Sequence, residues 1–331
     1  MMRRSLPVLA AAATLLASAA CGNDSPVALG EQLLPGQPVT SFEVVLDAEQ
    51  FLALDSAFAL FTTPSQASYT IVANDFAGTL DAHALATFSI VKTITVRDTA
   101  GTGTVIDTLP NYFAGRVLLR VDTLRSSHDA AHFAVYRAAE SWDERSTTWD
   151  LRVDTGSVTL PWTQPGGTLG PLIAEGDWAR ADGDSVFLAF DSATVQALRD
   201  STIAERGLIV VTETPGARMR LTSIGLRADA RSSRADTVVT TNGVAFDRTF
   251  IYTPSPGTRT DDGRVGGVPS WRTLIRLIPD LGDVRVTCPG LPPCTYLLSE
   301  TEITTASLEY MLAAPPAGFV LEDSLRIGAV P

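Results

Sequence analysis

Side chains that could carry out chemistry are few in this sequence. Its three histidines are His83, His128 and His132, and the last two stand four residues apart in His-Asp-Ala-Ala-His. On a helix this spacing places both imidazoles on one face, where they could bind a metal ion. His132, however, begins a run of residues typical of a β-strand, so the shared helical face is lost. We interpret the pair as two unrelated loop residues and predict no metal site.

Three common catalytic motifs are missing from the sequence. It has no Gly-x-Ser-x-Gly elbow, no His-Glu-x-x-His and no Gly-rich phosphate loop ending in lysine, and Lys92 is its single lysine. Asp182-Gly183-Asp184 and Asp261-Asp262-Gly263 could offer oxygen ligands to calcium, but this pattern is more typical of turns. The 37 acidic residues single out no carboxylate pair for glycoside hydrolysis. We expect a protein that is not an enzyme and uses no cofactor; a polysaccharide hydrolase or lyase is the less favoured alternative.

Tryptophans supply the best candidates for ligand contact. Trp142 and Trp149 enclose the segment Asp-Glu-Arg-Ser-Thr-Thr, and Trp162 lies between prolines in a predicted loop. An exposed indole can stack on the C–H face of a sugar, whereas a buried indole caps a core with its N–H satisfied. The second interpretation is favoured for Trp142 and Trp149, and the two are balanced for Trp162. Together with Glu144, these tryptophans are the candidate ligand-binding residues.

The segment Trp142–Trp149 resembles the Trp-x-Glu-x-x-x-Thr-Trp pattern of the DNRLRE-type domains. These are β-sandwich modules of exported bacterial and archaeal proteins, related to a carbohydrate-binding module family. Arg116–Asp122, Phe190–Val195 and Gly207–Val210 resemble further elements of that family in the same order, so the resemblance covers about residues 110–230. The family's opening strand and its namesake motif are not found here. The resemblance therefore implies the β-sandwich fold more directly than it implies polysaccharide binding.

Most of the chain has the composition of β-structure, with runs of Val, Ile, Thr, Phe and Tyr bounded by Gly, Pro, Asp and Asn. The predicted strands are 42–46, 68–73, 86–97, 116–121, 132–137, 185–190, 208–212 and 218–226. One short helix is predicted over Asp191–Arg199, where Asp191 or Ser192 could cap the first turn. Because the repeated amphipathic helices of a parallel sheet are missing, the sequence predicts an all-β fold. We expect an antiparallel, jelly-roll-like β-sandwich.

The sequence divides into two predicted β domains, residues 41–235 and 236–331. Polar residues 228–247 suggest a linker between them. Arg272–Arg276 repeats the Arg-x-Leu-[Leu/Ile]-Arg pattern of Arg116–Arg120, which indicates a weak internal repeat. No counterpart of the tryptophan segment follows before Pro331. The second domain is thus expected to be smaller than the first or incomplete.

The N-terminus has the pattern of an export signal. Arg3 and Arg4 precede the apolar run Leu6–Ala20, which at about 1.5 Å per residue is too short for a ~30 Å hydrocarbon core. Small residues before Cys21 resemble the lipobox of bacterial lipoproteins, so Cys21 is the predicted lipidation site. An ordinary signal peptide cut after Ala20 is the alternative. Residues 21–40 are rich in Gly, Pro and polar residues and are predicted to form a tether.

The other two cysteines, Cys288 and Cys294, flank Pro-Gly-Leu-Pro-Pro. An exported chain meets an oxidising compartment, where an even number of remaining cysteines tends to pair. The prolines stiffen the short loop and no histidine lies nearby to complete a metal site. We therefore predict a Cys288–Cys294 disulfide.

The formal net charge of −12 excludes the broad basic surface that nucleic-acid binding needs. Hydrophobic residues make up 45% of the chain, enough for a sizeable core. The sequence thus predicts an exported protein held by a lipid anchor at the bacterial cell envelope, which binds polysaccharide or organises the cell surface without catalysis. A purely structural or adhesive scaffold is the alternative.

Overall fold

The structure is a computed structural model of the chain. It describes residues 45–46, 52–97, 103–202, 207–255, 257–260, 263–277, 285–288 and 294–297, together with residues 302, 305 and 307. The described residues fall into two compact units, one within residues 54–275 and another that includes residues 285–288 and 294–297. The domain boundaries 41–235 and 236–331 stay a prediction. Cys21 and the export signal lie outside the described residues.

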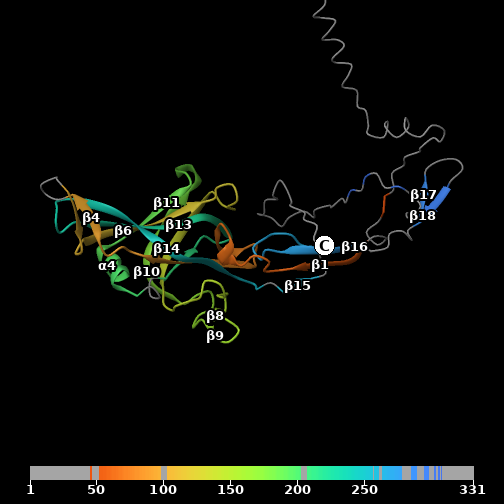
Figure 1. The fold of residues 1–331 in the computed structure, drawn as a ribbon, viewed down its shortest axis with the longest axis horizontal. Helices are drawn as coiled ribbons and strands as arrows, with labels where there is room; N and C mark the ends of the chain where they lie inside the picture. The colour runs from red at the N-terminus through yellow and green to blue at the C-terminus, as the bar shows by residue number, and fades with distance from the viewer. Residues whose placement is uncertain are drawn as a thin grey trace, which may run out of the picture. The chain divides into compact units, whose positions relative to one another are not determined.

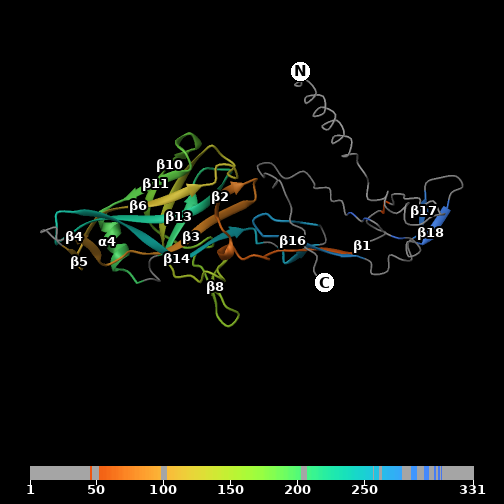
Figure 2. The ribbon, with the colours of Figure 1, turned by 45° about the horizontal axis from the view of Figure 1, so that its top comes forward.

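One large antiparallel sheet of nine strands dominates the first unit (Figure 1). Its strand order is β10-β7-β12-β3-β14-β13-β6-β11, and β2 pairs with both β13 and β3. The two end strands, β10 and β11, lie against each other, so the sheet curls until it nearly closes like a barrel (Figure 2). The nine strands are β2 (Thr70–Phe76), β3 (Leu80–Ser89), β6 (Asn111–Val121), β7 (Ala130–Ala138), β10 (Leu169–Ala179), β11 (Ser185–Phe190), β12 (Gly207–Thr212), β13 (Ala217–Arg231) and β14 (Val238–Thr253).

The prediction of an all-β, antiparallel fold with one short helix is confirmed. The helix is α4 (Ser192–Asp200), and the carboxylate of Asp191 caps it by accepting a hydrogen bond from the Thr194 N–H at 2.8 Å. Val195 packs over Gly115 of β6, where an added Cβ would lie 2.2 Å from the Phe190 ring. A glycine is therefore needed for the helix to approach the sheet this closely.

The inner face of the curled sheet is filled by the main hydrophobic core. Its side chains come from one face of nearly every strand and from α4. Along β6 the residues Val117, Leu119 and Val121 point inward and are buried, while Arg116 and Arg120 point outward. This alternation follows from the period-2 geometry of a strand.

Two local expectations differ from the structure. Residues 228–247 are not a linker, because β13 and β14 pair through them from Leu226↔Gly243 to Arg231↔Val238. The buried residues here are small, such as Ala228 and Ala230, so the alternation between inward and outward residues is hard to recognise from hydrophobicity. The predicted strand 86–97 is broken, because β3 ends at Ser89 and a separate strand, β4 (Ile94–Arg97), pairs with β5 (Thr104–Asp107).

Smaller sheets complete the described structure. β1 (Leu52–Phe58) pairs with β15 (Arg259–Thr260) and β16 (Arg272–Leu277), and β8 (Leu151–Asp154) pairs with β9 (Thr159–Pro161). In the second unit β17 (Arg285–Cys288) pairs with β18 (Cys294–Leu297), and Cys288 stands directly opposite Cys294 in the register. Within the described part of the chain, no helix is long and apolar enough to span a membrane.

Candidate functional site

The segment between β7 and β10 covers part of the sheet's outer face. It carries the β8–β9 hairpin, which Figures 1 and 2 show standing off the sheet. Beneath it lies a second hydrophobic cluster, which contains Trp162 and residues of β3, β7, β12 and β14, including Leu85, Ile209 and Ile251. The candidate tryptophans all belong to this cover or pack against the cluster, so the structure brings the predicted aromatic residues together.

Trp162 is the most deeply placed of the three. Its side chain is 4% exposed, and its indole N–H donates a hydrogen bond to the Thr148 carbonyl oxygen at 3.0 Å. Burial of a large ring with its polar atom satisfied is the arrangement of a structural tryptophan. Trp162 therefore presents no free ring face on which a sugar could stack.

Trp149 is half-buried and is held between glycine and histidine. An added Cβ at Gly166 would lie 2.8 Å from its ring, and the backbone there has φ of +88°, which favours glycine. The His83 ring lies 4.9 Å from the Trp149 ring, and His83 Nδ1 donates to the Gly166 carbonyl oxygen at 2.6 Å. Burial lowers the pKa of His83 even though this hydrogen bond raises it. The neutral imidazole thus acts as a packing and positioning group.

A turn brings Trp142 and Trp149 to the same cluster. The carboxylate of Asp143 accepts hydrogen bonds from the N–H and hydroxyl of Ser146, at 3.0 and 2.6 Å, and its carbonyl oxygen accepts from the Thr147 N–H at 3.0 Å. In a continuous strand, two residues seven positions apart would point to opposite faces of the sheet. The turn reverses the chain between the two tryptophans, so both can pack on the same face. Trp142 is half-buried against Gly207, where an added Cβ would lie 3.1 Å from Nε1.

The covering segment is fastened at its base by a carboxylate that sequence reasoning did not single out. Glu140 accepts hydrogen bonds from the Thr163 N–H and hydroxyl, at 3.0 and 3.1 Å, and from the Thr168 hydroxyl. These bonds, the one from Thr168 first, lower the pKa of Glu140. The cover is therefore anchored by polar bonds as well as by its tryptophans.

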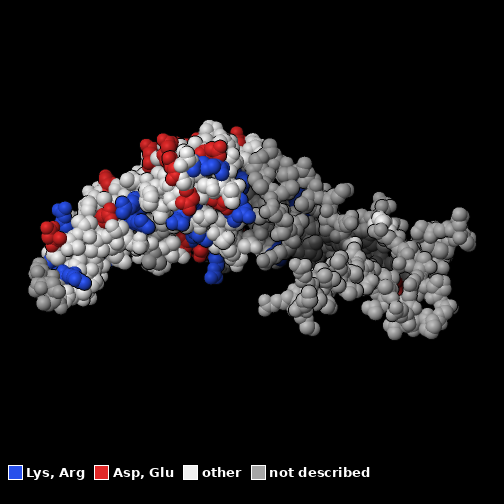
Figure 3. Space-filling view, turned by 90° about the horizontal axis from the view of Figure 1, so that it is seen from above, with Lys and Arg blue, Asp and Glu red and all other residues white. Residues whose placement is uncertain are grey.

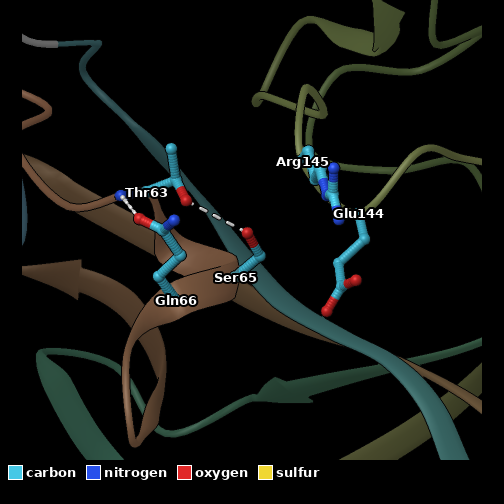
Figure 4. Close-up of a pocket in the computed structure, with 5 residues that line it drawn as sticks. All are labelled: Thr63, Ser65, Gln66, Glu144 and Arg145. Atoms are coloured by element: carbon cyan, nitrogen blue, oxygen red, sulfur yellow. Dashed lines mark hydrogen bonds between the residues drawn. The ribbon is translucent and has the colours of Figure 1, made fainter.

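Glu144 lines a hollow of about 470 Å³ (Figure 4). Glu144 and Arg145 form one wall. The opposite wall is Thr63 and the short helical turn η1 (Pro64–Gln66), which contributes Ser65 and Gln66. The Thr63 and Ser65 hydroxyl groups share a hydrogen bond at 3.1 Å, and Gln66 Oε1 accepts from the Thr63 N–H at 3.4 Å.

Arg248 of β14 fixes both walls of this hollow. Its backbone N–H donates to Glu144 Oε1 at 3.1 Å, and its guanidinium donates to the Ala67 carbonyl oxygen, just after η1, at 3.1 Å. One residue of the rigid sheet therefore sets the separation between the two loop segments. This is the property that a preformed binding site needs.

Asp247 of β14 lies near the carboxylates of Glu144 and Asp143. Burial raises the pKa of Asp247, and the nearby carboxylates of Glu144 and Asp143 raise it further. Asp247 follows a bulge in the β14–β3 pairing, at which Phe246 is 52% exposed. Within the described ranges, no group of three or more His, Cys, Asp or Glu side chains is placed to hold a metal ion.

The four predicted ligand-binding residues do not form one site in the structure. Trp142, Trp149 and Trp162 pack on the sheet, whereas Glu144 lies at the rim with groups that no motif marked. The residues from η1 lie about 80 positions earlier in the chain, so only the fold brings them to Glu144. Hydroxyl, amide, carboxylate and guanidinium groups across an open hollow can exchange hydrogen bonds with a polyhydroxylated ligand.

No protein-family model, curated protein or solved structure matches the chain. The resemblance to the DNRLRE-type domains remains a prediction.

Proposed function

We propose that the protein is a non-catalytic module of the bacterial cell envelope that binds polysaccharide through the hollow beside Glu144. The observation that supports this is the fixed pair of polar walls that Arg248 holds apart. The volume of about 470 Å³ falls within the ~300–1,000 Å³ of small-molecule sites, enough for a sugar unit at the end or bend of a chain. The hollow has no exposed tryptophan to stack on the sugar, so the affinity is weak, on the order of 1 mM.

Arg145→Ala and Glu144→Gln test the site. Glu144→Gln keeps an oxygen for the Arg248 N–H, so it removes charge with little strain. Retardation of the full-length chain in gels that contain a panel of neutral and acidic polysaccharides would give the affinity. We expect at least one polysaccharide to retard the wild type and each variant to bind about tenfold more weakly, which corresponds to ~1.4 kcal/mol.

Arg97→Ala is a matched control, because Arg97 is an exposed arginine on the separate β4–β5 hairpin. It should bind as the wild type does. If no polysaccharide retards the wild type, or if Arg145→Ala and Glu144→Gln bind normally, the hollow is not the binding site. The purely structural or adhesive scaffold would then be favoured, since the three candidate tryptophans already serve packing.

The lipid anchor is part of the same proposal. If Cys21 is lipidated, the full-length chain partitions into the detergent phase on warming with Triton X-114, and Cys21→Ser moves it to the aqueous phase. Mass spectrometry of the N-terminal peptide would identify the modification. A wild type that partitions like the variant would instead support an ordinary signal peptide cut after Ala20.

The Cys288–Cys294 disulfide also remains a proposal. Its support is the register of β17 and β18, which places the two Cα atoms directly opposite, as a cross-strand disulfide needs. Alkylation of the exported protein should label neither cysteine before reduction and both after it. Labelling of both without reduction would contradict the pairing.

A further inference from the structure

The outer face of the sheet is covered in some places and bare in others. The hydrophobic cluster under the β8–β9 hairpin covers outer residues of β3, β7, β12 and β14, including Leu85, Ala134, Ile209 and Ile251. On the outer sides of β6, β11 and the second half of β13, the alternate residues remain half-exposed or exposed. A sheet face that is left bare in this way is available to a partner.

This bare surface, which we call the arginine face, is defined by Arg116, Arg120, Arg227, Leu118 and Phe187. Arg120 and Arg116 alternate along β6, and Arg227 of β13 stands directly opposite Arg116. Phe187 of β11 is 53% exposed and stands opposite Leu118. The residues between them are small, namely Ala189, Ser223 and Gly225, so the arginines, Leu118 and Phe187 are the large side chains of this face.

The charges on the arginine face are only partly balanced. Two guanidinium groups placed directly opposite each other on neighbouring strands repel. Asp229 reaches Arg116 at 3.6 Å, and Asp184 reaches Arg120 at 4.0 Å. Arg227 lies over the Phe187 ring at 6.0 Å, and no carboxylate of the described residues forms an ion pair with it. An acidic partner would relieve this repulsion.

A complementary surface lies on the other side of the seam between β10 and β11. This carboxylate face is defined by Glu175, Asp177, Glu213, His132 and Leu172. Asp177 stands directly opposite His132, whose Nδ1 donates to it at 2.8 Å, and Glu175 lies 3.8 Å from His132 Nε2. The side chain of Asp177 is 89% exposed, and Leu172 is an exposed apolar side chain on the same strand. The carboxylate of Glu213 also interacts electrostatically with His132, so three carboxylates lie near one imidazole.

We propose that the arginine face of one molecule binds the carboxylate face of a second copy, in a head-to-tail association. Each face combines charge with an exposed apolar side chain, Phe187 on one and Leu172 on the other. Among the described residues, no ion pair joins the arginine face to the carboxylate face of the same molecule. A contact between two unlike faces leaves one of each free, so the association can continue into a ring or an open chain.

On the face that Figure 3 shows, both signs of charge occur in small groups rather than as one continuous field.

Salt dependence and charge-reversal variants of the two faces test this proposal. Sedimentation velocity of the full-length chain in a non-ionic detergent should show association that grows with concentration at 50 mM NaCl. At 500 mM NaCl the association should weaken at least about tenfold, because the screening length falls well below 10 Å. Arg116→Glu with Arg227→Glu, and separately Glu175→Arg with Asp177→Arg, should each leave monomers. Mixing these two double variants should restore association, since each mutated face then meets its opposite.

The controls separate this contact from folding and from other partners. Arg116→Gln with Arg227→Gln is the milder pair, which keeps the proposal testable if a charge reversal prevents folding; Arg97→Glu should associate normally. A wild type that stays monomeric at about 200 μM and 50 mM NaCl would overturn the proposal. So would association that survives all these variants, or a mixture that remains monomeric. If the wild type is monomeric but binds dextran sulfate through Arg116 and Arg227, the arginine face serves a polyanion instead.

Discussion

Removal of the Trp162 ring tests whether the covering segment is built on its tryptophans. Trp162 is 4% exposed, and its N–H is bonded to the Thr148 carbonyl oxygen. Truncation of a buried tryptophan to alanine costs about 3–5 kcal/mol, and a hydrogen bond contributes ~0.5–1.5 kcal/mol. We therefore expect Trp162→Ala to lower the free energy of unfolding by about 3–5 kcal/mol. Trp162→Phe keeps most of the ring contact and loses the hydrogen bond, so it should cost about 1–2 kcal/mol.

Urea unfolding followed by circular dichroism measures both variants without relying on tryptophan fluorescence. The full stability of a domain is ~5–15 kcal/mol, so Trp162→Ala should shift the midpoint far. Phe246→Ala is the control, because this ring is 52% exposed and its loss should cost less than about 0.5 kcal/mol. A loss below ~1 kcal/mol for Trp162→Ala, together with lost polysaccharide retention, would refute the structural role and make Trp162 a ligand contact.

Three further outcomes follow from other parts of the fold. Burial alone would raise the pKa of Asp107, but hydrogen bonds from the backbone N–H groups of Leu109 and Ser233 and from the hydroxyl groups of Ser232 and Ser233 hold it well below its usual range. Its stabilising effect is therefore complete above the unfolded-state pKa of about 3.9 and declines as the pH falls towards the lowered pKa of the folded state, so the melting-temperature gap between wild type and Asp107→Asn should narrow from pH 5 to pH 2. Gly115→Ala should lower stability by about 1–3 kcal/mol, whereas Gly225→Ala, whose Cβ would lie 3.8 Å from its nearest neighbour, should change it little in chemical denaturation. The hydrogen bond to Asp177 raises the pKa of His132, so an NMR titration should place this pKa above 6.5, and Asp177→Asn should lower it. The contact stabilises the fold fully below pH 6.5, and this stabilisation is lost as the pH rises through the raised pKa of His132.

Sequence periodicity identified the elements that alternate between large apolar and polar residues. Strand β11 lies at the residues predicted for it, and α4 begins at its predicted cap, because the local pattern alone determines both. The hairpin of β13 and β14 was missed, since its inward residues include Ala228 and Ala230, which differ little from a polar linker in hydrophobicity. The break after Ser89 was missed for the opposite reason, because Ile94 and Val96 are buried and continue the alternation of β3.

The candidate site was only half accessible to sequence reasoning. Composition and spacing drew attention to the tryptophan segment, and the structure places its rings together on one face of the sheet. Composition and spacing could not reveal that Arg248 hydrogen-bonds both to Glu144 and to the Ala67 carbonyl oxygen after η1, because these residues are far apart in the chain and form no motif. Pairing across a sheet determines such contacts, and a single sequence does not report it.

The division of the sheet's surface limits where a partner can bind. The inner face is filled by the main core, and the covering segment buries much of the outer face with tryptophans. Binding is then left to the hollow, where Glu144 and Arg145 lie, and to the arginine and carboxylate faces. The hollow and the arginine face come from different elements, so their functions should separate. Arg145→Ala should leave self-association unchanged, and the Arg116→Gln, Arg227→Gln pair should leave polysaccharide retention unchanged. A variant that alters both would mean that the two proposals describe one extended surface.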